Sequence, residues 1–383
     1  MRDYTTADFL QDPNQSTPLL VRFSQAGGMR GTPDTVRDIR GFAVRFYTGQ
    51  GNFDLVGNHI PVFFVRDAMR FPETIAALSP SPVNNLPDPE RFWRFIGKTP
   101  EAMHMLMWLY SDCGTVDSYR HIEGHGVNTY VWKNKQGVRR YVKYHWLPLA
   151  GVRCITRQQA LELMSQPNIA GQDLYDTLAR GEQVEYELYV QLMDPEQADS
   201  LPYDPLDDTK VWDTDAFPMV RVGRITLDRN PEDYRAQVEN VGFSPANLVP
   251  GIELSADRML QGRAFAYWDS QRRRLGPDFR EIPVNRFAGW NPQQTLVTSG
   301  NGTTVCGELG RSGIEKTDDF TQARKFYANL SDGQQEHLVD NIASELYQTS
   351  EATKQAVLPW LETVHADLVQ RVQTRMDWYQ SHD

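Results

Sequence analysis

The sequence predicts an α+β protein, in which an antiparallel β-barrel or sandwich is followed by helices. Residues 1–229 contain short runs rich in Val, Tyr and Phe, and turn signals such as TGQGN and KNKQG separate these runs. Residues 230–312 are rich in Pro and Asn without a regular period, which is typical of a segment that wraps over another domain. Residues 313–383 show apolar residues at helical spacing. We therefore predict three domains with these boundaries.

The first region is expected to consist mainly of strands, because β-branched and aromatic residues fill its apolar runs. Several short strands separated by turns favour closure into a barrel. Helical interruptions are expected near residues 87–110 and 157–180. The expected strands lie in PLLVRFS, GFAVRFYTG, NFDLVGNHIPVFFV, VNTYVWKN, GVRRYVKYHWL and VEYELYVQLMD.

One helix is expected inside the wrapping segment. Ser255 at the N-cap and Asp257 in the first turn favour a helix that begins there and continues through RMLQGRAFAY. A small bundle of helices is then expected at the C-terminal end. Its helices are expected in DDFTQARKFYANL, DGQQEHLVDNIASELYQ and KQAVLPWLETVHADLVQRVQTRM.

Composition and charge limit the classes of function. The chain of 383 residues has a net charge of −11, so no basic surface for general nucleic-acid binding is expected. No apolar run is long enough to span a membrane, and the start of the sequence lacks the apolar core of a signal peptide, so we predict a cytoplasmic protein. Cys113, Cys154 and Cys306 are far apart in sequence and are expected to be reduced thiols.

Several common catalytic motifs are absent from the sequence. It contains no GxxxxGK[ST] loop, no GxGxxG after a strand and no GxSxG. His121 and His125 have HxxxH spacing and follow Cys113, which could indicate zinc. Their segment contains glycine and leads into a strand, however, so structural histidines are the favoured interpretation.

The tyrosine in RAFAYWDSQ can be interpreted in two ways. Arg263 and Tyr267 are four residues apart and share one helical face, which Gln271 and Arg274 extend. A phenol beside cations ionises more readily. Tyr267 is therefore either a half-buried residue covered by arginine stems or a phenolate that ligates a metal. The spacing alone leaves both interpretations open.

Asn58 is the second candidate, in the stretch GNHIPVFFVRD. It is expected at the end of a strand, as either a turn residue or an amide that points into an aromatic-lined pocket. In such a pocket the amide could donate a hydrogen bond to a small oxygen ligand without a change of charge. Alternation along the strand places His59 on the opposite face from Asn58.

These stretches together resemble the monofunctional haem catalases, whose iron is ligated by tyrosine. RAFAYWDSQ fits the haem-ligand signature of that family, and the resemblance is close over residues 21–67, 205–234 and 249–285. It implies a catalase-like antiparallel β-barrel with a wrapping segment and a C-terminal helical domain. It also implies the conversion of two molecules of hydrogen peroxide to water and oxygen, as a defence against oxidative stress.

The resemblance also implies a role for each residue that matches a family position. Tyr267 would ligate the ferric iron of haem as a phenolate, and Arg263 would stabilise the anion. Asn58 would polarise peroxide. The remaining matches are Arg22 and Arg274 (haem propionates or the proximal side), Ser24 (a hydrogen bond to the distal histidine), Phe63 and Phe71 (packing around haem) and Asp38 (an acid of the peroxide channel).

One family residue is missing from this pattern. The family has an essential distal histidine well before the RFS motif, whereas here RFS stands at residues 22–24 and the first histidine is His59. We expect an N-terminally shortened catalase. The alternative is a catalase-like haem-binding protein with little or no dismutase activity, and a barrel without cofactor is the least favoured hypothesis.

Two further expectations follow from the resemblance. The family forms tetramers with interlocked N-terminal arms, so a homo-oligomer with weaker interlocking is expected. NADPH, which some members bind, is not predicted, because Thr214 follows Trp212 where binding members have histidine. Gln271 and Arg273 likewise resemble the members that do not bind it.

Overall fold

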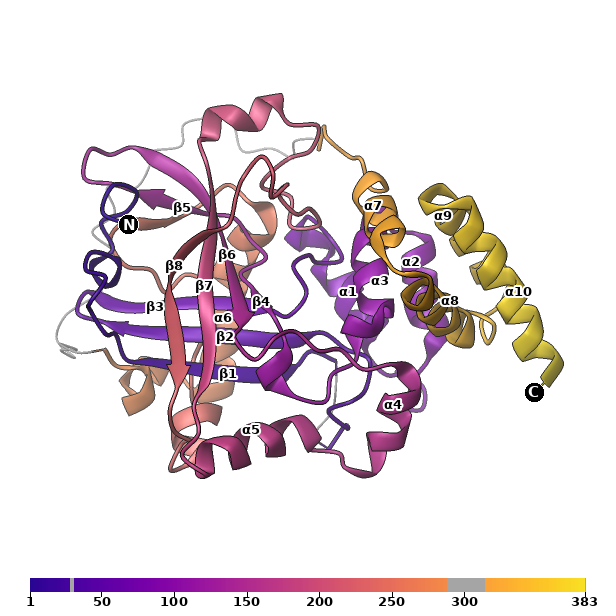
Figure 1. Cartoon of the computed structure of the whole chain (residues 1–383), viewed down its shortest axis with the longest axis horizontal. Coiled ribbons are helices and arrows are strands. Elements are labelled where there is room, and N and C mark those ends of the chain that lie inside the picture. Colours follow the sequence, from indigo (N-terminus) through magenta and orange to yellow (C-terminus); the bar gives the residue numbers. More distant parts are fainter. Residues whose placement is uncertain (28–30, 288–313, 383) are drawn as a thin grey trace.

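The computed structural model describes residues 1–27, 31–287 and 314–382, and its main element is a curled antiparallel sheet (Figure 1). Neighbouring strands follow the order β1-β2-β3-β4-β6-β5-β9, and β7 pairs with both β6 and β8. The strands are β1 (Leu19–Gln25), β2 (Arg40–Thr48), β3 (Gly51–Asn58), β4 (Gly124–His125), β5 (Tyr130–Lys133), β6 (Arg139–Pro148), β7 (Val184–Met193), β8 (Val220–Leu227) and β9 (Ile252–Leu254).

The curled sheet encloses an aromatic core. Alternate residues of each strand point inward, and large rings such as Phe42, Trp132 and Tyr186 are almost fully buried there. Both predicted hairpin turns are confirmed. Gly51 and Gly137 have φ of 143° and 81°, backbone conformations that favour glycine, and each residue helps to turn the chain between two strands.

Helices cover the end of the sheet that lies away from the N-terminus (Figure 1). The predicted helical interruptions are confirmed near residues 87–110 and 157–180. The helices of the first region are α1 (Phe71–Leu78), α2 (Pro89–Gly97), α3 (Met103–Tyr110), α4 (Arg157–Glu162) and α5 (Ile169–Ala179).

The C-terminal helices share one hydrophobic core with α2 and α3. Trp93 and Leu106 belong to the same buried cluster as Leu361 and Val372. The last predicted helical stretch divides at His365, whose φ of −162° and ψ of 131° are extended. The C-terminal helices are α7 (Thr321–Asn329), α8 (Asp332–Leu346), α9 (Glu351–Val364) and α10 (Ala366–His382).

The wrapping segment contains the predicted helix α6 (Arg258–Leu275). The expected N-cap was wrong by two residues. Asp257 caps the helix by accepting a hydrogen bond from the Leu260 backbone N–H, whereas the Ser255 hydroxyl donates to the Thr129 carbonyl. A carboxylate at this position satisfies the free N–H groups of the first turn and interacts favourably with the helix dipole.

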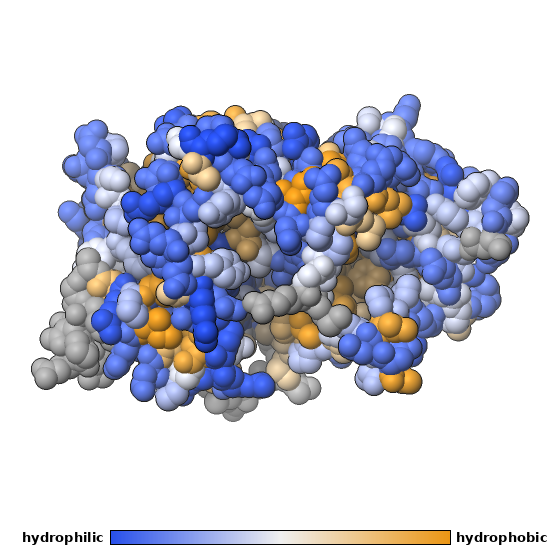
Figure 2. All heavy atoms as spheres, turned by 90° about the horizontal axis from the view of Figure 1, so that it is seen from below, coloured by the Kyte–Doolittle hydropathy of each residue, from blue (hydrophilic) through white to orange (hydrophobic). Residues whose placement is uncertain are grey.

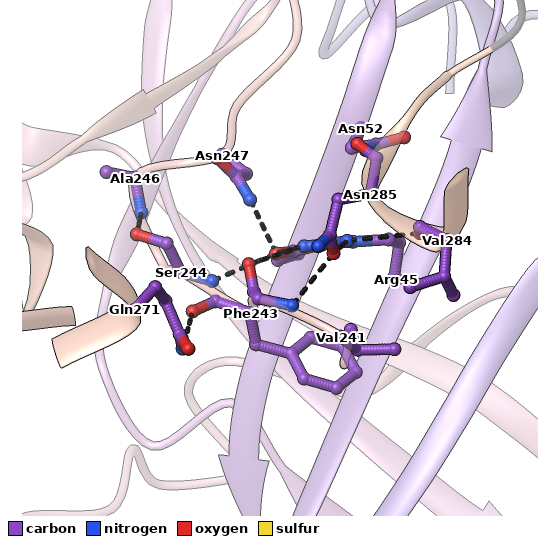
Figure 3. A network of polar contacts seen from close by, with 12 residues as sticks. Arg45, Asn52, Val241, Phe243, Ser244, Ala246, Asn247, Gln271, Val284 and Asn285 are labelled. Atoms are coloured by element: carbon purple, nitrogen blue, oxygen red, sulfur yellow. Dashed lines mark hydrogen bonds and ion pairs between the residues drawn. The ribbon is translucent and has the colours of Figure 1, made fainter. Parts of the chain in front are cut away.

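A buried ion pair attaches the wrapping segment to the outer face of the sheet (Figure 3). Arg45 of β2 donates to Asp54 of β3 at 2.6 Å and to the Asn285 side-chain oxygen at 2.6 Å. Gln271 of α6 donates to the Phe243 carbonyl at 2.8 Å. These bonds fix α6 and the segment around Phe243 against β2 and β3, which positions the site described below.

The face of the molecule shown in Figure 2 is mainly hydrophilic, with separate hydrophobic patches. Among the helices of the described ranges, none is long and apolar enough to cross a membrane.

Candidate functional site

Helix α6 places Arg263 and Tyr267 in direct contact, as their spacing predicts. The Arg263 guanidinium donates to the Tyr267 hydroxyl at 3.1 Å, and its carbon lies 5.2 Å from the centre of the ring. Tyr267 is half-buried and packs against a cluster on the outer face of the sheet, which is formed by Ala43, Val56, Val241 and Phe243. The phenol therefore stands on a hydrophobic surface with one cation beside its oxygen.

The Arg263 guanidinium is the centre of a hydrogen-bond chain that the sequence did not reveal. Besides Tyr267, it donates to the Asn128 side-chain oxygen at 2.5 Å and to the Val56 carbonyl at 2.7 Å. The Asn128 amide in turn donates to Asp257 at 2.9 Å. Burial alone lowers the pKa of Arg263, but the neighbouring phenols of Tyr267 and Tyr130 raise it overall. The cation is thus held in place and fully charged.

Asn58 lies on the same face of the sheet as Tyr267. The strand register aligns Ser24, Gly41, Asn58 and His125 in one row across β1 to β4. Val56, against which Tyr267 packs, is two residues before Asn58 and therefore faces the same side. The Ser24 hydroxyl lies where a Cβ atom at Gly41 would stand, so glycine at this position makes room for the Ser24 side chain beside Asn58.

Two arginines line a hollow of about 410 Å³ at the edge of this face. The Arg22 guanidinium lies 4.8 Å from the centre of the Phe243 ring. Burial and the nearby charge of Arg274 lower the pKa of Arg22. Arg274 donates to Gln271 at 2.8 Å and to the Val241 carbonyl at 2.6 Å. A carboxylate ligand would offset the destabilisation of Arg22 by Arg274, although Asp34 and Glu239 also line the hollow.

The two phenylalanines that are predicted to pack around haem lie side by side. The rings of Phe63 and Phe71 are stacked, with centroids 6.0 Å apart. The turn before Phe71 closely approaches α6, because a Cβ atom at Gly262 would overlap the Ala68 side chain. Asp38 lies at the far end of β1, where its carboxylate accepts hydrogen bonds from the backbone of Ala26 and Gly27 at 2.9 Å.

The two histidines nearest Asn58 in the fold differ in their partners. His59 is buried, and its ring accepts from the Arg40 N–H at 2.9 Å and lies 2.9 Å from the Cys113 carbonyl. Burial is the main reason why the pKa of His59 is lowered to about 3. Both ring nitrogens of His59 are therefore occupied by backbone groups. His125, the cross-strand neighbour of Asn58, instead lies 2.9 Å from His145 through their Nδ1 atoms.

The HxxxH histidines also have separate partners. His121 lies 2.8 Å from the Gly151 carbonyl through Nδ1, whereas His125 contacts His145. Over the described ranges, no group of three or more His, Cys, Asp or Glu residues is arranged to hold a metal ion. Tyrosine is not one of these four residue types, so this absence does not bear on a metal that is held by a single phenolate.

The donors of this site suit an iron porphyrin. An oxygen ligand with its own cation fits a ferric ion, the outer face around Val56 fits an apolar ring, and the two arginines fit its carboxylates. These residues could therefore hold haem, with Tyr267 as the candidate iron ligand.

Comparisons with known proteins identify the family. The family model described as Catalase matches residues 1–308, and the model described as Catalase-related immune-responsive matches residues 313–376. The chain belongs to the catalase family.

Individual relatives show the same similarity. Catalase-2 of Bacillus subtilis is 38% identical over 97% of this chain and 60% of its own length. The Listeria monocytogenes catalase is 39% identical over 92% of this chain and 79% of its own length. Catalase-1 of Arabidopsis thaliana is 47% identical over 73% of this chain and 57% of its own length. The chain thus spans less than two thirds of the Bacillus and Arabidopsis proteins.

The solved structures confirm the fold. Catalase A of Saccharomyces cerevisiae has a TM-score of 0.90 at 34% identity, over 98% of this chain and 85% of its own. A bacterial catalase has a TM-score of 0.91 at 34% identity, over 98% of this chain and 82% of its own. The predicted catalase-like antiparallel barrel with C-terminal helices is therefore confirmed, whereas the three domain boundaries and the site roles stay predictions.

Proposed function

We propose that this protein is a haem catalase that converts two molecules of hydrogen peroxide to two of water and one of oxygen. The observation that carries the proposal is the 3.1 Å contact between Arg263 and Tyr267 on the sheet face that also bears Asn58. Named relatives that share this fold are catalases. They give no support to the alternative of a catalase-like haem-binding protein with little or no dismutase activity.

The proximal residues would hold the cofactor. Tyr267 would bind ferric iron as a phenolate, while Arg22 and Arg274 would pair with the haem propionates. Arg263 would stabilise this phenolate by its charge and by the hydrogen bond that it donates to the Tyr267 oxygen. When bound, haem supplies the two-electron redox chemistry that peroxide cleavage requires.

On the peroxide side, Asn58 would donate its amide N–H to a peroxide oxygen. An amide keeps the same charge before and after the reaction, so it can orient the substrate in both half-reactions. Proton transfer between the peroxide oxygens requires a base. His59 does not suit this role, because both of its ring nitrogens are bonded to the backbone.

Homo-oligomer formation, a cytoplasmic location and the absence of bound NADPH remain predictions from the sequence. Hydrogen peroxide and haem are the only small-molecule partners we propose.

The first experiment is oxygen evolution from hydrogen peroxide, per bound haem, by the haem-loaded chain. Tyr267→Phe removes the ligand oxygen, so we expect loss of the Soret band of wild type and a fall in oxygen evolution of more than about 100-fold. Tyr175→Phe is the matched control, because Tyr175 is 54% exposed on α5. A wild-type chain that binds haem through Tyr267 but evolves no oxygen would instead support the haem-binding alternative.

A further inference from the structure

Two cysteines that are 41 residues apart in sequence are in contact in the fold. Cys113 lies in a short turn, Asp112–Gly114, and Cys154 lies between β6 and α4. Their Sγ atoms are 2.8 Å apart, and the Cys154 thiol donates to Cys113. Both are free thiols and half-buried, so solvent reaches the pair.

Hydrogen bonds hold the two segments together on both sides of Cys154. The Thr115 hydroxyl donates to the Ile155 carbonyl at 2.5 Å, and the Ile155 N–H donates to the Thr115 carbonyl at 3.3 Å. The Arg153 N–H donates to the His121 carbonyl at 3.0 Å. A disulfide bond is about 2.05 Å long, so bond formation requires the sulfur atoms to approach by less than about 1 Å.

The two thiols are not equivalent. The hydrogen bond from Cys154 is the main reason why the pKa of Cys113 is lowered, and a hydrogen bond from Ser111 contributes. The same hydrogen bond to Cys113 raises the pKa of Cys154. Because the thiolate is the nucleophilic form of cysteine, and Cys113 is the sulfur that accepts the hydrogen bond, we expect Cys113 to react first.

We propose that Cys113 and Cys154 are an oxidisable dithiol, which hydrogen peroxide converts to an intramolecular disulfide. The Cys113 sulfur attacks one peroxide oxygen, so that an S–O bond forms, the O–O bond breaks and the other oxygen leaves as hydroxide, which is protonated to water. The Cys154 sulfur then displaces the oxygen on Cys113, so that the S–S bond forms and a second water leaves. The dithiol loses two electrons and two protons, and one peroxide becomes two waters.

Hydrogen bonds connect the turn that carries Cys113 to segments of the candidate peroxide site. His59, which follows Asn58, lies 2.9 Å from the Cys113 carbonyl, and the Asp38 N–H donates to the Gly114 carbonyl at 3.1 Å. A disulfide would fix the turn that supports both segments. Closure of a 41-residue loop is expected to raise the melting temperature by about 5 °C. The inference does not require catalase activity, because the oxidant is supplied from outside.

The test uses the full haem-loaded chain with Cys306→Ser, which leaves two thiols; Cys306 lies outside the described residues. After reduction and removal of the reductant, the chain is exposed to a steady supply of hydrogen peroxide from a generating enzyme, so that turnover does not exhaust it. We expect loss of both alkylatable thiols, a mass lower by about 2 Da, a linked peptide pair, and reversal by dithiothreitol.

Two single variants test the order of the steps. With Cys154→Ser, Cys113 is expected to accumulate as a sulfenic acid that dimedone traps. With Cys113→Ser, Cys154 is expected to be labelled by dimedone at least about tenfold more slowly. Two thiols that remain alkylatable after peroxide, or disulfides that join two chains, would overturn the proposal. Equal dimedone labelling of the two variants would overturn the assignment of Cys113 as the attacking sulfur.

Discussion

Arg263 connects the candidate iron ligand to the rest of the fold through three acceptors. We expect Arg263→Gln to weaken haem binding by at least about tenfold, because the Tyr267 phenolate loses its cation. The buried oxygens of Asn128 and Val56 also lose a donor, which should lower the free energy of unfolding by about 1–3 kcal/mol. Haem titration and urea unfolding measure the two effects.

Matched variants separate charge from geometry at this residue. Arg263→Lys keeps the positive charge but cannot bond to three acceptors at once, so its haem affinity should be intermediate. Arg180→Gln removes a surface arginine that pairs with Glu182 and should change neither property. Unchanged haem affinity in Arg263→Gln would mean that the guanidinium does not support the tyrosinate.

Helix α6 depends on Asp257 at its N-terminus for both stability and position. The Asp257 carboxylate accepts from the Leu260 backbone and from the Asn128 amide at 2.9 Å each. Asp257→Ala should therefore lower the free energy of unfolding by about 2 kcal/mol or more and also weaken haem binding several-fold.

A second helix cap provides the control for this prediction. Ser331→Ala removes the cap of α8, whose side chain accepts from the Gln334 N–H, far from the candidate site in sequence. It should cost about 1 kcal/mol of stability and leave haem affinity unchanged. Equal haem affinity in the two cap variants, measured on folded protein, would show that the start of α6 does not position the site.

The elements of the fold could be predicted from local patterns, whereas the connections between them could not. Alternating apolar residues and glycine turns indicate the hairpins, and the four-residue spacing of Arg263 and Tyr267 indicates their contact. Asn128 gives no such signal, because it is 135 residues from Arg263 and meets it only after the sheet has curled. Cys113 and Cys154 likewise come together through tertiary structure.

The stability of the whole molecule should fall in mild acid because burial lowers the pKa of several histidines, among them His59 and His104. The pKa of His59 is lowered to about 3 and that of His104 to about 4, mainly by burial, from an ordinary value of about 6.5. Below pH 6.5 the unfolded chain binds protons that the folded chain does not. Between pH 7.5 and 5.0, each histidine should thus cost about 2 kcal/mol of unfolding free energy.

Urea unfolding at the two pH values measures this loss, and His59→Gln is the informative variant. It should reduce the difference between the two pH values by about 2 kcal/mol, whatever its effect on stability at pH 7.5. Burial raises the pKa of Asp208, so Asp208 contributes a pH dependence of stability with the opposite sign. This contribution is the same in wild type and in the variant, so the difference between them reports on His59. An unchanged pH difference would contradict a neutral, buried His59.

The core shared by α2, α3 and the C-terminal helices also affects how the chain is made. Trp93 and Leu106 leave the ribosome long before Leu361 and Val372, which complete their packing. At about 5–20 residues per second, synthesis from residue 110 to residue 376 takes roughly 15–50 s. During that interval we expect the nascent chain to expose apolar side chains of α2 and α3, to which chaperones can bind. Production of native protein should therefore depend on chaperone supply more than the stability of the finished molecule suggests.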